Sequence, residues 1–196
     1  MDIRNFIFKN RGVIPVPIVL YLIFSSNPGI NFYSFLGFVL ILLGESLRIN
    51  SVRYAGGKTR SVHLKSSDLA TNGPYAYVRN PIYIGNTIIW CGAVLLSNTP
   101  FLLPTVFFIF LFFSVEYNVI ISLEEEYLSK EYGNQYIKYK KNVPKLIPRF
   151  SKWDGGENFY KNNLVDTIKI EKSTLQGLGL FFLIIIMKSI SVSYTH

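Results

Sequence analysis

One segment of the chain combines turn-forming residues, aromatic side chains and an arginine just before an apolar stretch. It covers residues 72–86 and reads Asn-Gly-Pro-Tyr-Ala-Tyr-Val-Arg-Asn-Pro-Ile-Tyr-Ile-Gly-Asn. Gly73-Pro74 predicts a turn, and Pro81 suits the first position of a helix, where its missing N–H costs nothing. Asn80 then falls at the N-cap, where its side chain can satisfy amides of the first turn. Such a helix start is suited to hold a carboxylate or a phosphate.

A second group of candidate residues is acidic. Glu124 and Glu125 follow a long apolar run, and their carboxylates could bind ribose hydroxyls, an ammonium or a sulfonium. Alternatively, they pair with nearby lysine and arginine side chains and have no other role. Glu116 lies eight residues before Glu124 on roughly the same helical face, so it would extend a polar stripe into the apolar run. Basic and acidic groups facing one another would suit a zwitterionic ligand.

Composition excludes several other kinds of site. Cys91 is the only cysteine, so we expect neither an intrachain disulfide nor a thiolate metal site. His63 and His196 are too few and too far apart for a metal centre. No Ser-His-Asp pattern, phosphate-binding loop or dinucleotide-binding glycine motif occurs, which argues against cofactor binding on an α/β sheet.

The overall composition indicates a membrane protein. Hydrophobic residues make up 49% of the 196 residues and charged residues only 16%, whereas about a quarter is usual in soluble domains. The net charge of +8 would suggest a nucleic-acid partner in a soluble chain. Here the basic residues flank apolar segments, so membrane lipids with anionic headgroups explain them better and no nucleic-acid partner is expected.

The apolar stretches predict an all-α polytopic bundle of about five transmembrane helices. The first would run over 13–24, counting from about Ile7, although Pro15 and Pro17 should bend or delay it. The remaining four are expected at 32–54, 82–96, 101–123 and 174–190. Residues 151–173 are expected to form a polar connector.

Within the second of these helices, Glu45 and Arg48 stand three residues apart. Side chains at that spacing lie on the same face of a helix and can form an ion pair. Either they neutralise one another near the membrane interface, or they line a polar cavity.

Residues 124–150 predict a helix that leaves the bilayer and then an extended exit. Leu128, Tyr132, Tyr136 and Tyr139 recur at helical spacing and form an aromatic stripe, which Gly133 would divide. Packing against the membrane interface is the favoured explanation of this stripe, ahead of ligand contact.

Basic residues also predict the orientation. The N-terminus, the loop over 55–79 and the region over 130–172 hold nearly all lysines and arginines, whereas the loops at 25–31 and 97–100 hold none. The N-terminus should therefore be cytoplasmic and the C-terminus outside, with both candidate segments on the cytoplasmic side.

Together, the two segments resemble the motifs of the isoprenylcysteine carboxyl methyltransferases and the related phospholipid N-methyltransferases. Residues 73–85 are similar to the Gly-Pro-Tyr…Arg-His-Pro-x-Tyr-x-Gly motif of that family. The second block, over residues 124–148, matches at Glu124-Glu125, Leu128, Tyr132-Gly133, Tyr136, Tyr139, Val143-Pro144 and Ile147-Pro148. Sterol reductases share a related C-terminal pattern, so an activity other than methyl transfer stays open.

The resemblance implies one methyltransferase domain over residues 1–196, with its core motifs between 70 and 150, and S-adenosylmethionine as the methyl donor. The donor would bind in a cytoplasmic pocket, and a lipophilic acceptor, prenylated or lipid, would enter from the membrane. The implied cofactor contacts are Tyr75, Val78, Arg79, Asn80, Pro81, Tyr83, Gly85, Glu124 and Glu125. Arg79 or Arg149 could hold a carboxylate acceptor, and Glu124, Glu125 or a tyrosine could take a proton from an amine acceptor.

One residue departs from the family motif, because Asn80 stands where the motif has histidine. Asparagine can cap a helix and donate a hydrogen bond, but it cannot be protonated near neutral pH. Carboxyl O-methylation is the leading hypothesis. The alternatives are N-methylation of a phospholipid or another amine, and a non-catalytic membrane protein that keeps the fold.

Overall fold

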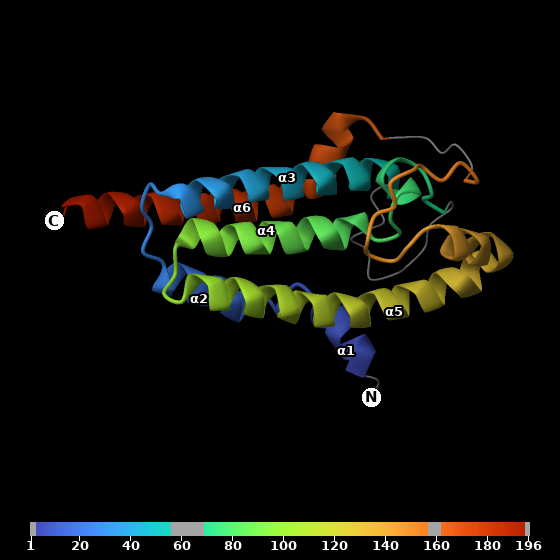
Figure 1. Cartoon of the computed structure of the whole chain (residues 1–196), viewed down its shortest axis with the longest axis horizontal. Coiled ribbons are helices and arrows are strands. Elements are labelled where there is room, and N and C mark those ends of the chain that lie inside the picture. The colour runs from blue at the N-terminus through green and yellow to red at the C-terminus, as the bar shows by residue number, and fades with distance from the viewer. Residues whose placement is uncertain (1–2, 56–68, 157–161, 195–196) are drawn as a thin grey trace.

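The computed structural model describes residues 3–55, 69–156 and 162–194, and the described part of the chain is all-helical, without β-strands (Figure 1). The predicted all-α class is confirmed. Residues 56–68 of the predicted basic loop over 55–79, with His63, and His196 at the C-terminus lie outside the described residues. The elements in chain order are α1 (Ile3–Asn10), α2 (Val16–Ser25), α3 (Phe32–Ala55), the short 3-10 helix η2 (Gly73–Ala76), α4 (Pro81–Ser97), α5 (Leu102–Asn142) and α6 (Leu164–Tyr194).

Three of the described helices, α3, α5 and α6, are long and apolar enough to cross a membrane. Helices α2 and α4 are apolar but shorter. Large apolar side chains are exposed along α5, including Phe107 at 68% and Leu111 at 51% exposure. Such an apolar surface is costly in water and suits lipid, so the chain is a membrane protein.

The predicted first helix over 13–24 is delayed to α2, as its two prolines indicated, and the residues from Ile7 belong to a separate helix, α1. Pro15 precedes the first residue of α2, and Pro17 lies in its first turn. Proline lacks the N–H that a helix interior needs and clashes with the preceding turn, so the helix ends and restarts here. The ten residues of α2 extend only about 15 Å.

Helices α3 and α4 pack backbone against backbone through glycines. A Cβ at Gly44 would lie 2.7 Å from the Gly85 carbonyl oxygen, and one at Gly92 would lie 2.7 Å from the Gly37 carbonyl oxygen. Small residues allow helices in lipid to approach this closely. The pair α3–α4 therefore forms a tight platform, and α4 then turns into α5 to complete the predicted hairpin (Figure 1).

Helix α5 continues well beyond its apolar part and bends at Gly133, as predicted. Gly133 has φ +47° and ψ −122°, a backbone conformation that favours glycine. After the bend, Tyr136 and Tyr139 are 1% and 2% exposed and pack with Leu69 and Val143 in a small core of their own. The expectation that this aromatic stripe packs against the membrane interface is therefore wrong at these two tyrosines, which contact protein.

Helix α6 begins at Leu164, ten residues before the predicted start, so the expected connector is helical beyond that point. Asn163 starts the helix, since its Oδ1 accepts the Asp166 N–H at 2.8 Å. Near the other end, Lys188 Nζ donates to the Ile23 and Ser26 carbonyl oxygens at 2.9 and 2.8 Å, at the C-terminal end of α2. These contacts hold α6 beside the bundle, where it runs along α3 (Figure 1).

Candidate functional site

The two motif segments are joined by one arginine. Arg79 Nε and Nη2 lie 3.0 and 2.9 Å from Glu125 Oε1, and both side chains are 9% exposed. The remaining guanidinium nitrogen, Nη1, donates to the carbonyl oxygens of Lys140 and Val143 at 2.8 and 2.6 Å. The Lys140 ammonium lies 3.1 Å from Glu125 Oε2. Arg79 thus fastens the start of α4 to α5 on both sides of the bend.

Backbone contacts add to this connection. The Arg79 N–H donates to Pro144 O at 2.9 Å and the Arg149 N–H to Tyr77 O at 3.0 Å. The Trp153 N–H donates to Ala76 O at 3.1 Å. The exit segment 143–153 therefore lies against residues 76–80.

Asn80 occupies the N-cap position of α4, as predicted, but its side chain does not cap the helix. Its Nδ2 instead donates to the Lys145 carbonyl oxygen at 3.1 Å. The predicted capping role is wrong, because the exit segment 143–153 supplies an acceptor within reach of the amide. Asn80 is one more tie between the two motif segments.

Glu124 has a different environment from its neighbour Glu125. Tyr83 donates its phenolic hydrogen to Glu124 Oε1 at 2.7 Å, and the Tyr83 ring packs on Tyr117 with centroids 4.9 Å apart. Among the described residues, no cation lies within ion-pair distance of Glu124, whereas Glu125 and Glu126 both have such partners. The simple pairing hypothesis therefore accounts for Glu125 and leaves Glu124 as the carboxylate most available to a ligand.

Tyr75, in the first motif segment, is buried and contacts the second segment. Its carbonyl oxygen accepts the Tyr139 hydroxyl at 2.7 Å. Burial, together with the nearby negative charge of Glu124, raises the pKa of the Tyr75 phenol well above its usual range. Tyr75 therefore stays a neutral phenol throughout the physiological pH range.

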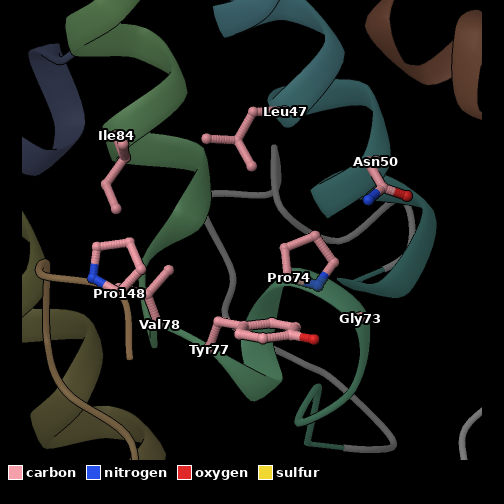
Figure 2. A pocket seen from close by; sticks show the side chains of 8 residues that line it. All are labelled: Leu47, Asn50, Gly73, Pro74, Tyr77, Val78, Ile84 and Pro148. Atoms are coloured by element: carbon pink, nitrogen blue, oxygen red, sulfur yellow. The ribbon is translucent and has the colours of Figure 1, made fainter. Parts of the chain in front are cut away.

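A cavity of about 410 Å³ adjoins these contacts (Figure 2). Its volume lies within the usual range of about 300–1,000 Å³ for small-molecule sites. The lining is mainly apolar and comes from α3, the first motif segment, α4 and the exit segment: Leu47, Asn50, Gly73, Pro74, Tyr77, Val78, Ile84 and Pro148. Sequence reasoning missed Leu47, Asn50 and Ile84, because apolar or amide residues inside helices carry no local sign of a cavity.

Of the remaining predicted site residues, some lie at this cavity and others do not. Val78 lines the cavity, and Pro81 is buried in the first turn of α4. A Cβ at Gly85 would lie 2.8 Å from both Arg48 Cγ and Gly44 O, so the open face of this glycine is filled by α3. Among the described residues, the Arg149 guanidinium binds Asn142 O and Ser151 Oγ, and the structure does not bring it to the two glutamates.

A buried polar network lies at the contact of α3, α4 and α6. The predicted pair of Glu45 and Arg48 is present, with 3.5 Å between Oε2 and Nε. Arg48 also hydrogen-bonds Asn86 of α4 and lies 2.5 Å from Glu171 of α6, which is 1% exposed. Sequence reasoning missed these two partners, because Glu171 stands in a charged stretch that is typical of a solvated connector.

Comparison with known proteins identifies the family. A family model described as phospholipid methyltransferase matches residues 32–135, which is more than half of the chain. The chain belongs to the phospholipid methyltransferase family. The match covers α3, α4 and α5 as far as its bend, and so includes the first motif segment, Glu124 and Glu125.

Several relatives carry more specific names. The chain is 38% identical over 120 residues to a protein-S-isoprenylcysteine O-methyltransferase of Schizosaccharomyces pombe, covering 59% of this chain and 48% of the relative. It is 32% identical over 117 residues to protein-S-isoprenylcysteine O-methyltransferase B of Arabidopsis thaliana, covering 57% of each. It is also 24% identical over 137 residues to the cobalt-zinc-cadmium resistance protein CzcN of Cupriavidus metallidurans, covering 65% of this chain and 59% of the relative. The chain spans about half the length of these relatives.

Proposed function

We propose that the chain is an integral-membrane methyltransferase that uses S-adenosylmethionine and acts on a lipophilic acceptor, most like a protein-S-isoprenylcysteine carboxyl O-methyltransferase. One observation carries this proposal: the Arg79–Glu125 pair joins two motif segments beside a cavity that both segments line. Membership of the family and the names of the relatives support the same activity.

The chemistry of the side chains fits such a methyl donor, which supplies a methyl group on a positively charged sulfur. Glu124 can face this positive charge or accept hydrogen bonds from ribose, since the contact from Tyr83 engages only Oε1. The other proposed contacts are Tyr75, Val78, Arg79, Asn80, Pro81, Gly85 and Glu125. Of these, Arg79, Asn80 and Glu125 would act mainly by holding the two segments in place.

Methyl transfer is an in-line displacement, so the protein mainly has to position the reactants and exclude water. The buried Val78 keeps water from one side of the cavity. A carboxylate acceptor is already a nucleophile and needs only a positive group to hold it. Arg149 is more available for this role than Arg79, whose guanidinium nitrogens already contact Glu125 and two carbonyl oxygens.

The proposed topology follows from the basic residues around the site. Lys140, Lys145 and Arg149 lie at the same end of the bundle as Arg79, and they contact the residues of the site or of α5. The positive-inside rule then puts this end and the N-terminus in the cytoplasm and the C-terminus outside. Soluble donor would reach the site from the cytoplasm, and the acceptor would enter from lipid.

A second candidate is N-methylation of a phospholipid or another amine, because the matching family model is described by phospholipid substrates. An amine acceptor must lose a proton, and in this case Glu124 would take it. The deciding experiment supplies donor labelled in its methyl group to membranes that contain the protein and then treats the lipid and protein extracts with base. Methyl esters release the label and N-methyl groups retain it, whereas absence of incorporation would favour a non-catalytic role.

A further inference from the structure

Glu116 is the one residue of the predicted polar stripe that the proposed methyl-transfer site does not use. It is 6% exposed, and neither of its carboxylate oxygens has a hydrogen-bond partner among the described residues. A buried carboxylate without partners is costly in an apolar environment. The described part of the chain provides no such partner, so a group from outside it would be bound favourably here.

The Glu116 carboxylate lies at a second cavity, of about 370 Å³, on the side of α5 that faces α1. Every other lining residue is apolar, and they come from α1, from the link to α2 and from α5: Ile7, Ile14, Phe108, Leu111, Phe112 and Val115. None of these residues lines the cavity beside the motif segments. The two cavities are therefore distinct sites.

Two features of this second cavity select the charge of an occupant. The Glu116 carboxylate accepts hydrogen bonds and attracts a cation, whereas it repels a carboxylate or a phosphate. Phe108 and Phe112 line the same cavity with ring centroids 6.2 Å apart, and aromatic faces also attract cations. An ammonium provides three donors and the opposite charge, and an attached hydrocarbon chain would fill the apolar walls.

We propose that this cavity binds a single-chain amphiphile with a primary amine, whose nitrogen donates to Glu116. The site lies outside the proposed methyl-transfer centre and needs no methyl donor. Because α1 contacts α5 here, an occupant would also fix the N-terminal helix against the bundle.

The two tryptophans of the chain, Trp90 and Trp153, allow a direct test. Trp90 stacks on Phe113 at 4.8 Å between centroids, and Phe113 meets the cavity residue Phe112 edge to face at 5.2 Å. In a Trp153→Phe background, Trp90 fluorescence therefore reports on the second cavity. The protein is placed in phosphatidylcholine nanodiscs and titrated with dodecylamine, dodecanol or dodecanoic acid, without methyl donor.

We expect dodecylamine to produce a saturable change in Trp90 emission, and dodecanoic acid to produce none. Glu116→Gln should weaken dodecylamine binding about tenfold or more, because the charged acceptor is lost. Glu131→Gln, at an exposed position of the same helix, should bind as the parent does. A Glu116→Leu variant, which suits an apolar cavity, should fold and fail to respond.

The proposal is overturned if Glu116→Gln binds dodecylamine as tightly as the parent, or if dodecanol or dodecanoic acid binds equally well. Failure of this test leaves the proposed methyl transfer untouched, because none of the proposed donor contacts lines the second cavity. Failure of donor binding would likewise leave the amine site standing.

Discussion

Arg79 and Glu125, 46 residues apart in sequence, form a nearly buried ion pair in which Nε and Nη2 of one side chain face the same oxygen of the other. Arg79 also holds the Lys140 and Val143 carbonyl oxygens, which lie beyond the bend of α5 at Gly133. One guanidinium therefore fixes the relative positions of α4, the membrane part of α5 and its bent end. Together with the backbone hydrogen bonds and the Asn80 amide, this contact joins the two motif segments that resemble methyltransferases into one unit.

Arg79→Ala should destabilise the protein strongly. Removing one partner of a buried pair typically costs about 3–5 kcal/mol, and here the buried Glu125 carboxylate would keep only Lys140, among the described residues, as an ion-pair partner. Unfolding of the purified protein in mixed detergent and dodecyl sulfate measures the change. Lys130→Ala, which breaks the exposed pair with Glu126, is the matched control and should leave the unfolding midpoint where it was. Equal stability of the two variants would contradict the role given to Arg79.

Tyr83→Phe should weaken the site without disturbing the helices. The substitution removes the hydroxyl that donates to Glu124 and leaves a partly buried carboxylate with one partner fewer, at a cost of about 1–3 kcal/mol. We expect lower affinity for S-adenosylmethionine and an unchanged circular dichroism spectrum. Tyr21→Phe, at an exposed position of α2, controls for loss of a phenol. If Tyr83→Phe bound S-adenosylmethionine with unchanged affinity, Glu124 would not be part of the donor site.

Gly85→Ala should separate α3 and α4. The added Cβ would meet Arg48 Cγ and Gly44 O at 2.8 Å, and the latter is backbone that cannot rotate away. Overpacking of this kind typically costs about 1–3 kcal/mol. Gly177→Ala is the control, because nothing lies within 4 Å of a Cβ there. The thermal unfolding midpoints of both variants in detergent measure the difference. An unchanged midpoint in Gly85→Ala would mean that the two helices can move apart at little cost.

Asn80 can be tested by two substitutions with opposite expectations. Asn80→Ala removes the hydrogen bond to the Lys145 carbonyl oxygen and should cost about 1 kcal/mol. Asn80→His restores the histidine of the family motif and retains an N–H donor, so it should fold with nearly parental stability. The same unfolding measurement separates the variants. If alanine were as stable as asparagine, the amide would have no part in holding the exit segment.

The helices that sequence predicted well are those whose limits are set locally. The predictions of 32–54 and 82–96 lie within one residue of α3 and α4 at each end, because uninterrupted apolar runs end at glycine, proline or polar residues. The bend at Gly133 was likewise visible as a glycine within a helical pattern. In contrast, the two closely spaced prolines indicated a bend or delay in the first helix, but not that the chain would form two separate helices there.

The errors at longer range share one physical cause, since each depends on a partner distant in sequence. Glu171 is buried in α6 because Arg48, 123 residues away, neutralises it. Tyr136 and Tyr139 pack against Leu69 rather than lipid, and the Asn80 amide meets the Lys145 carbonyl oxygen rather than its own helix. The residue types were enough to find the two motif segments. Only the tertiary structure shows which of their side chains hydrogen-bond or pair with one another.

Binding of S-adenosylmethionine to the purified protein, measured by titration calorimetry in detergent, tests the central claim most directly. We predict binding at a single site with a dissociation constant of about 1 μM to 1 mM, the usual range of enzyme substrates. Glu124→Gln should weaken this binding about tenfold, whereas Glu126→Gln should not. The contradicting result is a protein that is folded by circular dichroism and unfolds cooperatively but does not bind the donor. It would release no heat at any of these concentrations and would show no binding by equilibrium dialysis.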